Sequence, residues 1–553
     1  MEFRLALIKN QITYFGKNMK FNSLILFSLI LLIGCNSVDY KEEDFAIAAE
    51  NGKLANESYI RSLNCVKAWM NIRDSACGLI PTNLTGKKDL WEPFNSAADN
   101  YAFMVLTAYL LDQDLYNGEM LDMLHSEKKL TSRIKSLPDV YRFSTRTFDT
   151  EKADTTWIIF GTSEYIKDGL IPLTEYIGPS PWTNRMMEML DDLSGYYTVF
   201  RNLNQMGTYK AVSEEVNGSM LQALSRIYWM TGNEKYLDWA IKIGDYYLVD
   251  ERDLSKVEYL RLRDHGCEII GGLSELYVTL NYKRPEKKKQ YQERYYKVLD
   301  RVLEVGRNDD GLFYNAVNAL TGEPVDSSVV DNWGYIFDAY YSVYMIDNKE
   351  EYRQAFLDGI KSLNEKYRNF AWEGTSHDGY ADALESGINL YNREPLPELK
   401  NWIDSEMKVM WGMQKENGII GGAHPDGNFE RTAIMYALWK TQGVICSPWR
   451  EDVKIGSDLK DGKLYISIST EKAWQGKLIF DYNRHHEILH LPIDYPRINQ
   501  FPEWFTITSL NKYELIDYNK KIKSQITGTE LRDGIEMDIN GGEACHISVS
   551  EIK

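Results

Sequence analysis

The 553-residue chain has few cysteines, no long basic stretch and no apolar run long enough to span a membrane comfortably. Six cysteines cannot supply a disulfide framework for a chain of this length. With 63 basic and 81 acidic residues the net charge is −18, which argues against a nucleic-acid partner. No glycine-rich phosphate loop follows a strand, and no Gly-x-Ser-x-Gly elbow occurs. A hydrophobic content of 44% predicts folded domains rather than disorder.

The N-terminal apolar run, Leu24–Ile33, is followed at once by Gly-Cys ending at Cys35. This pattern resembles a bacterial lipobox, with Met19 as the natural start and Cys35 as the lipidated residue. We therefore expect a signal region over residues 1–34 and an acidic tether over 35–55. The mature protein would be lipid-anchored to a bacterial membrane, either periplasmic or on the outer-membrane surface. A buried N-terminal helix ending in Gly-Cys is the alternative.

From about residue 59 to 442 the apolar residues recur with the period of an α-helix. Short polar connections between these segments predict antiparallel neighbours. The clearest expected helices are 59–72, 97–111, 220–230, 235–248, 269–280, 288–305, 335–346, 351–367, 381–391, 399–413 and 432–439. The stretch 136–185 is expected to be a long irregular loop at the rim of a site.

A carboxylate or amide followed closely by glycine recurs near the starts of several expected helices, at 217, 264, 331, 378 and 426. The intervals are 47, 67, 47 and 48 residues, and about 47 residues is one helical hairpin with its loops. About six such hairpins predict a mainly α fold, an (α/α)6-type toroid over residues 56–445. An open solenoid of HEAT type is the alternative.

The last hundred residues show the pattern of β-strands instead of α-helices. Lys463–Ser469 alternates strictly between polar and apolar residues, as a half-buried strand does. Several such segments separated by Asp-Gly and Gly-Gly turns predict a C-terminal antiparallel β-sandwich over residues 446–553. Its polar segment 481–486 is expected to reach the helical barrel.

Aspartate at a helix start is often only an N-cap. In a closed ring, however, the inner helices all start at the same end, so these residues converge on one mouth. Two carboxylates in unlike environments can supply the acid and the base for glycosidic cleavage. We expect Asp264 and Asp378 to form that pair, with Glu268 and Glu430 as substitutes. His265 and His377 would tune them or share proton transfer.

The same mouth carries groups suited to holding a sugar, because aromatic rings stack on pyranose faces and polar groups bond hydroxyls. Trp333 and Tyr380 would form the aromatic platform, and Arg431 would hold a uronate carboxylate. The remaining expected substrate-binding residues are Asp99, Asn100, Asp331, Asp426 and Glu430. His265-x-Cys267 lacks a second cluster with zinc spacing, so neither a metal nor a cofactor is expected.

A lipobox, a helical toroid with Asp, His and Trp at inner helix starts, and a C-terminal β-sandwich together resemble the six-hairpin glycosidases. That resemblance implies an exo-acting glycoside hydrolase on oligosaccharides containing uronic acid, of β-glucuronidase or unsaturated-glucuronyl type, in polysaccharide utilisation. A polysaccharide lyase using Tyr380, His377, Asn332 and Arg431 is one alternative. A glycan-binding lipoprotein without turnover is another.

Overall fold

The computed structural model describes residues 40–201, 212–250, 252–421 and 427–552. Residues 40–553 form one compact unit. The predicted lipidation site Cys35, the first part of the predicted tether and Asp426 lie outside the described residues. No described helix is both long and apolar enough to cross a membrane.

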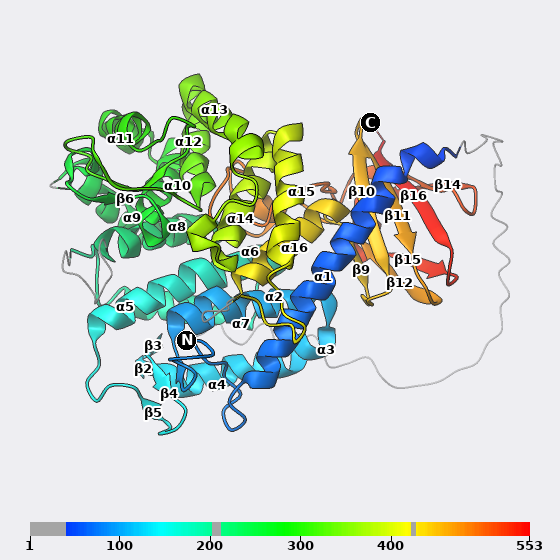
Figure 1. Cartoon of the computed structure of the whole chain (residues 1–553), viewed down its shortest axis with the longest axis horizontal. Helices are drawn as coiled ribbons and strands as arrows, with labels where there is room; N and C mark the ends of the chain where they lie inside the picture. Colours follow the sequence, from blue (N-terminus) through cyan, green and yellow to red (C-terminus); the bar gives the residue numbers. More distant parts are fainter. Residues whose placement is uncertain (1–39, 202–211, 251, 422–426, 553) are drawn as a thin grey trace, which may run out of the picture. The chain divides into compact units, whose positions relative to one another are not determined.

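The fold is the predicted toroid of helical hairpins followed by antiparallel sheets (Figure 1). Each helical segment of the inner layer packs on the next, and the last, α16, closes on α2. These segments are buried on almost every side, as expected for helices enclosed by a second layer. In ring order they are η2 (Pro93–Tyr101) with α2 (Ala102–Leu111), α5 (Thr155–Glu164) with η4 (Tyr165–Leu170) and α6 (Ile171–Ile177), α8 (Val212–Thr231), α10 (Glu268–Lys283), α12 (Trp333–Asp347), α14 (His377–Arg393) and α16 (Asn428–Thr441).

The ring thus holds seven inner segments among the described residues, where the sequence predicted about six. The outer layer is amphipathic. In α11, for example, Tyr291, Tyr295 and Leu299 face inward at helical spacing while charged residues face out. The outer helices are α1 (Ala46–Ile72), α4 (Leu121–Thr131), α7 (Pro181–Leu193), α9 (Glu234–Leu248), α11 (Pro285–Val305), α13 (Glu350–Lys366) and α15 (Pro397–Trp411).

Short elements fill the connections. The helical ones are η1 (Glu42–Asp44), α3 (Gln113–Leu115), η3 (Tyr116–Met120), η5 (Leu254–Lys256), η6 (Asp264–Gly266) and η7 (Trp372–Gly374). The strands among the helices are β1 (Leu90–Trp91), β2 (Ser132–Ile134), β3 (Leu137–Pro138), β4 (Tyr141–Arg142), β5 (Thr147–Phe148), β6 (Leu260–Arg261), β7 (Tyr314–Val317) and β8 (Pro324–Val329).

Two expectations about loops are wrong. The stretch 136–185 is largely helical, because it contains α5, η4, α6 and the start of α7. Its glycines and prolines resemble loop signals, and α5 is so completely buried that it has no polar face to reveal a helical period. The tether is also shorter than predicted. Helix α1 begins at Ala46, and Gly52 packs so closely on β10 that an added Cβ would lie 3.1 Å from the Gly456 nitrogen.

The C-terminal strands form two antiparallel sheets with a shared apolar core. One sheet has the order β10-β11-β16-β13-β14 and the other β15-β12-β9. The predicted strand Lys463–Ser469 is β11, with the predicted bounds. The elements are β9 (Ile445–Ser447), β10 (Lys454–Lys460), β11 (Lys463–Ser469), β12 (Trp474–Ile479), β13 (Lys512–Asp517), β14 (Ile522–Thr527), β15 (Ile535–Ile539) and β16 (Ala544–Glu551), with α17 (Arg484–Glu487) and α18 (Gly528–Asp533) between them.

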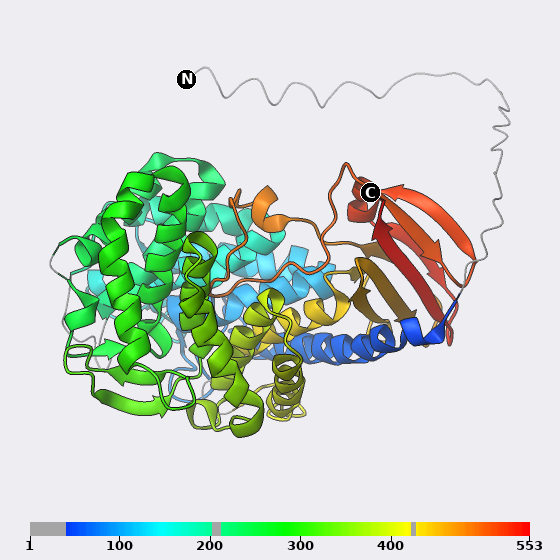
Figure 2. The same ribbon diagram turned by 90° about the horizontal axis from the view of Figure 1, so that it is seen from above.

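One segment connects the two parts of the fold. Between β12 and β13 the chain leaves the sheets and passes to the helices, where Leu489, Leu491, Tyr495, Ile498 and Phe501 join the core of the toroid (Figure 2). We call residues 484–503 the plug segment. The sequence predicted that 481–486 would reach the barrel, and the buried His485 does so, with Nε2 lying 2.8 Å from Oε1 of Glu175 in α6.

Candidate functional site

A cavity of about 740 Å³ lies where the inner helices begin. Among the described residues, its wall carries eight carboxylate side chains and two side chains with a full positive charge, Lys167 and Arg431. The lining residues are Asn95, Asp99, Glu164, Lys167, Asp168, Asp264, Glu268, Asn332, Tyr335, Glu373, Gly374, Thr375, Ser376, His377, Asp378, Asp382, Met413, Gly421, Asn428, Arg431, Ile498 and Asn499.

Helix starts do converge on one mouth, as the sequence predicted. The residues expected at the site that line the cavity are Asp99, Asp264, Glu268, His377, Asp378 and Arg431. They come from four separate parts of the chain: η2, the adjoining η6 and α10, α14, and α16. Close packing helps bring them together, because Gly218 of α8 lies against the first turn of α10. A Cβ at Gly218 would lie 2.3 Å from the backbone carbon of Glu268.

The predicted aromatic platform is wrong. Trp333 has no exposed surface and packs edge-on against Trp402, and Tyr380 is 1% exposed. Neither lines the cavity, because both side chains point into the interface between helices. Asn100, Asp331 and Glu430 are also buried and do not line it. The side chain of His265 and all of Asp426 lie outside the described part of the chain.

One part of the cavity wall, formed by Asp264, Glu373 and Thr375, combines strained backbone with acidic side chains. Asp264, Glu373 and Thr375 have φ values of 31°, 45° and 70°, in the region that side chains disfavour. Asp264 bonds to Arg261 over 2.9 Å, and Glu373 bonds to Arg263. Three non-glycine residues in strained conformations at one cavity are typical of a functional site.

Carboxyl groups crowded around this wall have raised pKa values. Burial, followed by the charges of Asp382 and Glu373, raises the pKa of Asp331 to about 8. Burial also raises the pKa of Asp382, and the Asp264 charge adds to the effect, while Arg431 opposes it. Asp382 lines the cavity with 16% of its side chain exposed. The site therefore places a carboxyl group with a raised pKa, Asp382, near a second carboxyl group, Asp264, that bonds to an arginine.

A second part of the cavity wall is an ion-pair network of Lys167, Asp168 and Glu268, and the sequence analysis did not predict this network. Lys167 of η4 is 1% exposed and lies 2.5 Å from Asp168 and 2.7 Å from Glu268. Burial alone would lower the pKa of Lys167, but the charges of Asp168 and Glu268 raise it well above its ordinary value. Lys167 and Asp168 were not predicted as site residues because they lie in the stretch 136–185, which the sequence analysis predicted to be a loop.

Arg431 makes the second network. Its guanidinium lies 2.7 Å from Asp382 and 2.8 Å from Glu385, and it donates to Asn428 over 2.9 Å. Tyr335 donates to Glu385 over 2.6 Å. Arg431 therefore reaches the cavity with its charge already matched by two protein carboxylates. This arrangement gives no support to the predicted contact with a uronate.

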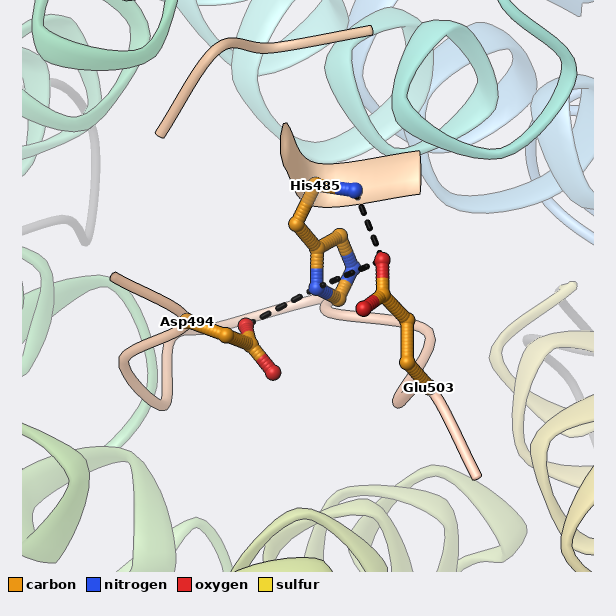
Figure 3. Close-up of side chains that lie close together, drawn as sticks. All are labelled: His485, Asp494 and Glu503. Atoms are coloured by element: carbon orange, nitrogen blue, oxygen red, sulfur yellow. Dashed lines mark hydrogen bonds and ion pairs between the residues drawn. The ribbon is translucent and has the colours of Figure 1, made fainter. Parts of the chain in front are cut away.

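The plug segment also holds an ionic cluster around the buried side chain of His485 (Figure 3). Nδ1 of His485 lies 2.8 Å from Asp494 and 3.3 Å from Glu503. Burial lowers the pKa of His485, but Asp494 and other carboxylates more than reverse this, so the net shift is upward. These three side chains have the geometry of a possible metal site, yet Asp494 also accepts from Arg393 over 2.7 Å and from Arg497 over 3.2 Å. We therefore interpret the cluster as an ion-pair network that attaches the plug segment to the toroid.

No protein-family profile and no curated protein sequence matches this chain. Among solved structures it is similar to the GH76A α-1,6-mannanase from Salegentibacter sp. HEL1_6, with a TM-score of 0.40 and 11% identity, covering 69% of this chain and 98% of that one. It is also similar to a sugar epimerase from a ruminal bacterium, with a TM-score of 0.38 and 15% identity, covering 56% of this chain and 86% of that one. A third similar structure is a family 88 glycosyl hydrolase from Bacteroides vulgatus, with a TM-score of 0.36 and 13% identity, covering 50% of this chain and 88% of that one.

Proposed function

We propose that this protein is a glycoside hydrolase that removes sugars from the end of a carbohydrate chain. The observation that carries the proposal is the pairing, in one cavity, of two carboxyl groups in unlike environments: Asp382, whose pKa is raised by burial, and Asp264, which bonds to Arg261. Glycosidic cleavage needs one carboxylic acid to protonate the leaving oxygen and one carboxylate to act at the anomeric carbon, directly or through water.

In this proposal Asp382 donates the proton and Asp264 is the second carboxylate. The originally predicted partner, Asp378, also lines the cavity and accepts a hydrogen bond from Asn428 over 2.7 Å. Asp378 therefore stays a candidate for the second carboxylate, and a comparison of variants decides between it and Asp264. His377 lies beside it and supports proton transfer or sugar binding.

The floor of the cavity supports action on chain ends. Ile498 and Asn499 of the plug segment line it, and this segment bonds to α8, α12 and α14, so we expect the plug to block a polysaccharide from passing through the toroid. A blind cavity accepts a terminal sugar more readily than the middle of a chain.

The charge of the wall supports a neutral sugar at the inner position. Eight carboxylates line the cavity, and both full cations that line it are bonded to carboxylates. An additional uronate there would meet repulsion rather than a free cation. The uronic-acid specificity predicted from the sequence is therefore the second substrate class to test.

Of the residues predicted for the lyase alternative, Tyr380 is buried outside the cavity, whereas His377, Asn332 and Arg431 line it, so His377 remains its candidate base. Proton abstraction next to a uronate needs the base within hydrogen-bond reach of the substrate. The binding-only alternative is weakened by Asp382, whose pKa is raised by burial at the cavity wall, since retention of a glycan needs no such group.

The test is turnover of neutral and uronate-bearing oligosaccharides by the soluble unit 40–553, following new reducing ends and unsaturated-uronate absorbance. We expect free terminal sugar without that absorbance. Asp264→Asn and Asp382→Asn should each lower kcat by about 10²- to 10⁴-fold. If Asp378→Asn is the defective variant and Asp264→Asn is not, the second carboxylate is Asp378. Binding without turnover on every substrate would refute the hydrolase.

We also propose that Cys35 carries a lipid and that the protein is bound to a bacterial membrane. The support is the sequence pattern alone, a short apolar run ending in Gly-Cys. The full chain should fractionate with membranes and incorporate labelled fatty acid, and Cys35→Ala should abolish the labelling. Labelling that persists in Cys35→Ala would refute the assignment.

A further inference from the structure

The plug segment touches almost the whole inner ring within five residues. Its backbone carbonyls at 496, 497 and 498 accept from Ser342 of α12, Asn389 of α14 and Arg226 of α8. The side chains of Tyr495 and Arg497 bond to Glu275 of α10 and Glu175 of α6. The C-terminal part of the chain thus occupies the axis of the toroid, directly under the cavity.

Asn499 is the residue of this segment that reaches the cavity wall. It is 2% exposed, and it bonds in three directions. Its Oδ1 accepts from Arg431 over 3.0 Å, and its Nδ2 donates to Asp168 over 2.9 Å. Its backbone N–H donates to Glu385 over 2.6 Å. Asn499 therefore joins the Arg431–Asp382–Glu385 network to the Lys167–Asp168–Glu268 network.

We propose that Asn499 is a positioning residue for the reaction, acting through Arg431 on the proton donor Asp382. The inference rests on the proposed function of this cavity. An amide is suited to this place because its oxygen accepts from the guanidinium while its nitrogen donates to a carboxylate. The neighbouring carboxylates Asp168 and Glu385 would repel an aspartate at the same position.

The same contacts assign a role to the C-terminal domain. The domain supplies part of the cavity floor and the residue that connects its two charged networks. It is therefore a component of the active site rather than a separable carbohydrate-binding module. Errors of about 1 Å in such a support are enough to lower kcat substantially.

The backbone at Asn499 permits a clean variant. Its φ is 58°, which asparagine and glycine adopt and other residues disfavour. Asn499→Gly keeps the backbone and its N–H bond to Glu385, and it removes only the two side-chain bonds. Asn369→Gly is the matched control, because Asn369 has a φ of 50° and is exposed on the surface.

We expect Asn499→Gly to lower kcat by about 10- to 100-fold with KM changed less than about threefold. The alkaline limb of the pH–rate profile, which reports the proton donor, should also move. Asn369→Gly should match the wild type in kcat, KM and pH profile. An Asn499→Gly variant with wild-type kcat and an unmoved pH profile would overturn the proposal.

A second measurement needs no substrate. The thermal midpoints of Asn499→Gly, Asp168→Asn and the double variant form a cycle that reports the contact itself. We expect the double variant to lose at least about 1 °C less than the sum of the single losses. Additive losses would refute the Asn499–Asp168 connection. A coupled cycle in a protein that hydrolyses no glycan would overturn the proposed function while leaving the connection in place.

Discussion

Replacing Asp331 with asparagine should make the protein more stable at alkaline pH and leave it unchanged at acidic pH. Asp331 is 5% exposed, and burial together with Asp382 and Glu373 raises its pKa from 3.8 to about 8. A raised pKa means that the folded state binds the proton that the unfolded state has lost. Stability from this group is thus full below about pH 4 and declines as pH rises through 8.

The size of the effect follows from that pKa difference. A carboxyl shifted from 3.8 to about 8 destabilises the folded protein by about 6 kcal/mol once it is ionised. This is an upper bound, because neighbouring carboxyls such as Asp382 share the proton load. Asparagine has the shape of the protonated acid and never ionises. The difference in stability between variant and wild type should therefore grow by up to about 1.4 kcal/mol per pH unit.

Urea unfolding at pH 4.5, 6, 7.5 and 9 measures this difference directly. Asp358→Asn is the control, because Asp358 is exposed and bonds to Lys361, which lowers its pKa. That variant should differ from wild type by less than about 1 kcal/mol at every pH. A difference for Asp331→Asn that does not depend on pH would refute the view that Asp331 holds a proton in the folded state.

Three further predictions concern packing and the plug. Gly456→Ala should lower stability by about 3 kcal/mol in chemical unfolding, because its Cβ would lie 2.0 Å from the Gly52 nitrogen, whereas Gly86→Ala, with open space around it, should have little effect. Trp333→Phe should lower the melting temperature and leave KM within about twofold, while a stacking platform would require a larger rise in KM. His485→Gln should lower the free energy of unfolding by about 3 kcal/mol at pH 6 and by less at pH 9. The reason is that a histidine with a raised pKa stabilises the fold only while its imidazole is protonated. An equal loss of stability at both pH values would contradict this.

Outer helices were the easiest elements to predict, because each shows a buried stripe and a charged face. The predicted segment 235–248 corresponds to α9 at Glu234–Leu248, and 288–305 corresponds to α11 at Pro285–Val305. The broken inner helix α5–η4–α6 was missed since burial on all sides removes the periodic signal. Its charged residues Lys167 and Asp168 were missed with it.

The convergence of Asp99, Asp264 and Asp378 could be predicted, because a closed ring brings equivalent helix ends together. The direction of each side chain could not. Trp333 and Asp264 both stand near inner helix starts, yet one faces a neighbouring helix and the other faces the cavity. Asn499 had no local signal at all, since its partners Asp168 and Glu385 lie 331 and 114 residues away.

The central position of the plug affects how this protein is made. Arg497 bonds to Glu175 across 322 residues, so nearly all of the chain must leave the ribosome before the ring gains its axis. Contacts of such long range form slowly in folding. Until then the nascent ring carries the buried Glu175 without His485 and Arg497, the two plug residues that bond to it. A chain interrupted shortly before residue 495 would retain the described toroid helices and still lack part of the cavity lining, so completion of the cavity depends on a segment that is synthesised late.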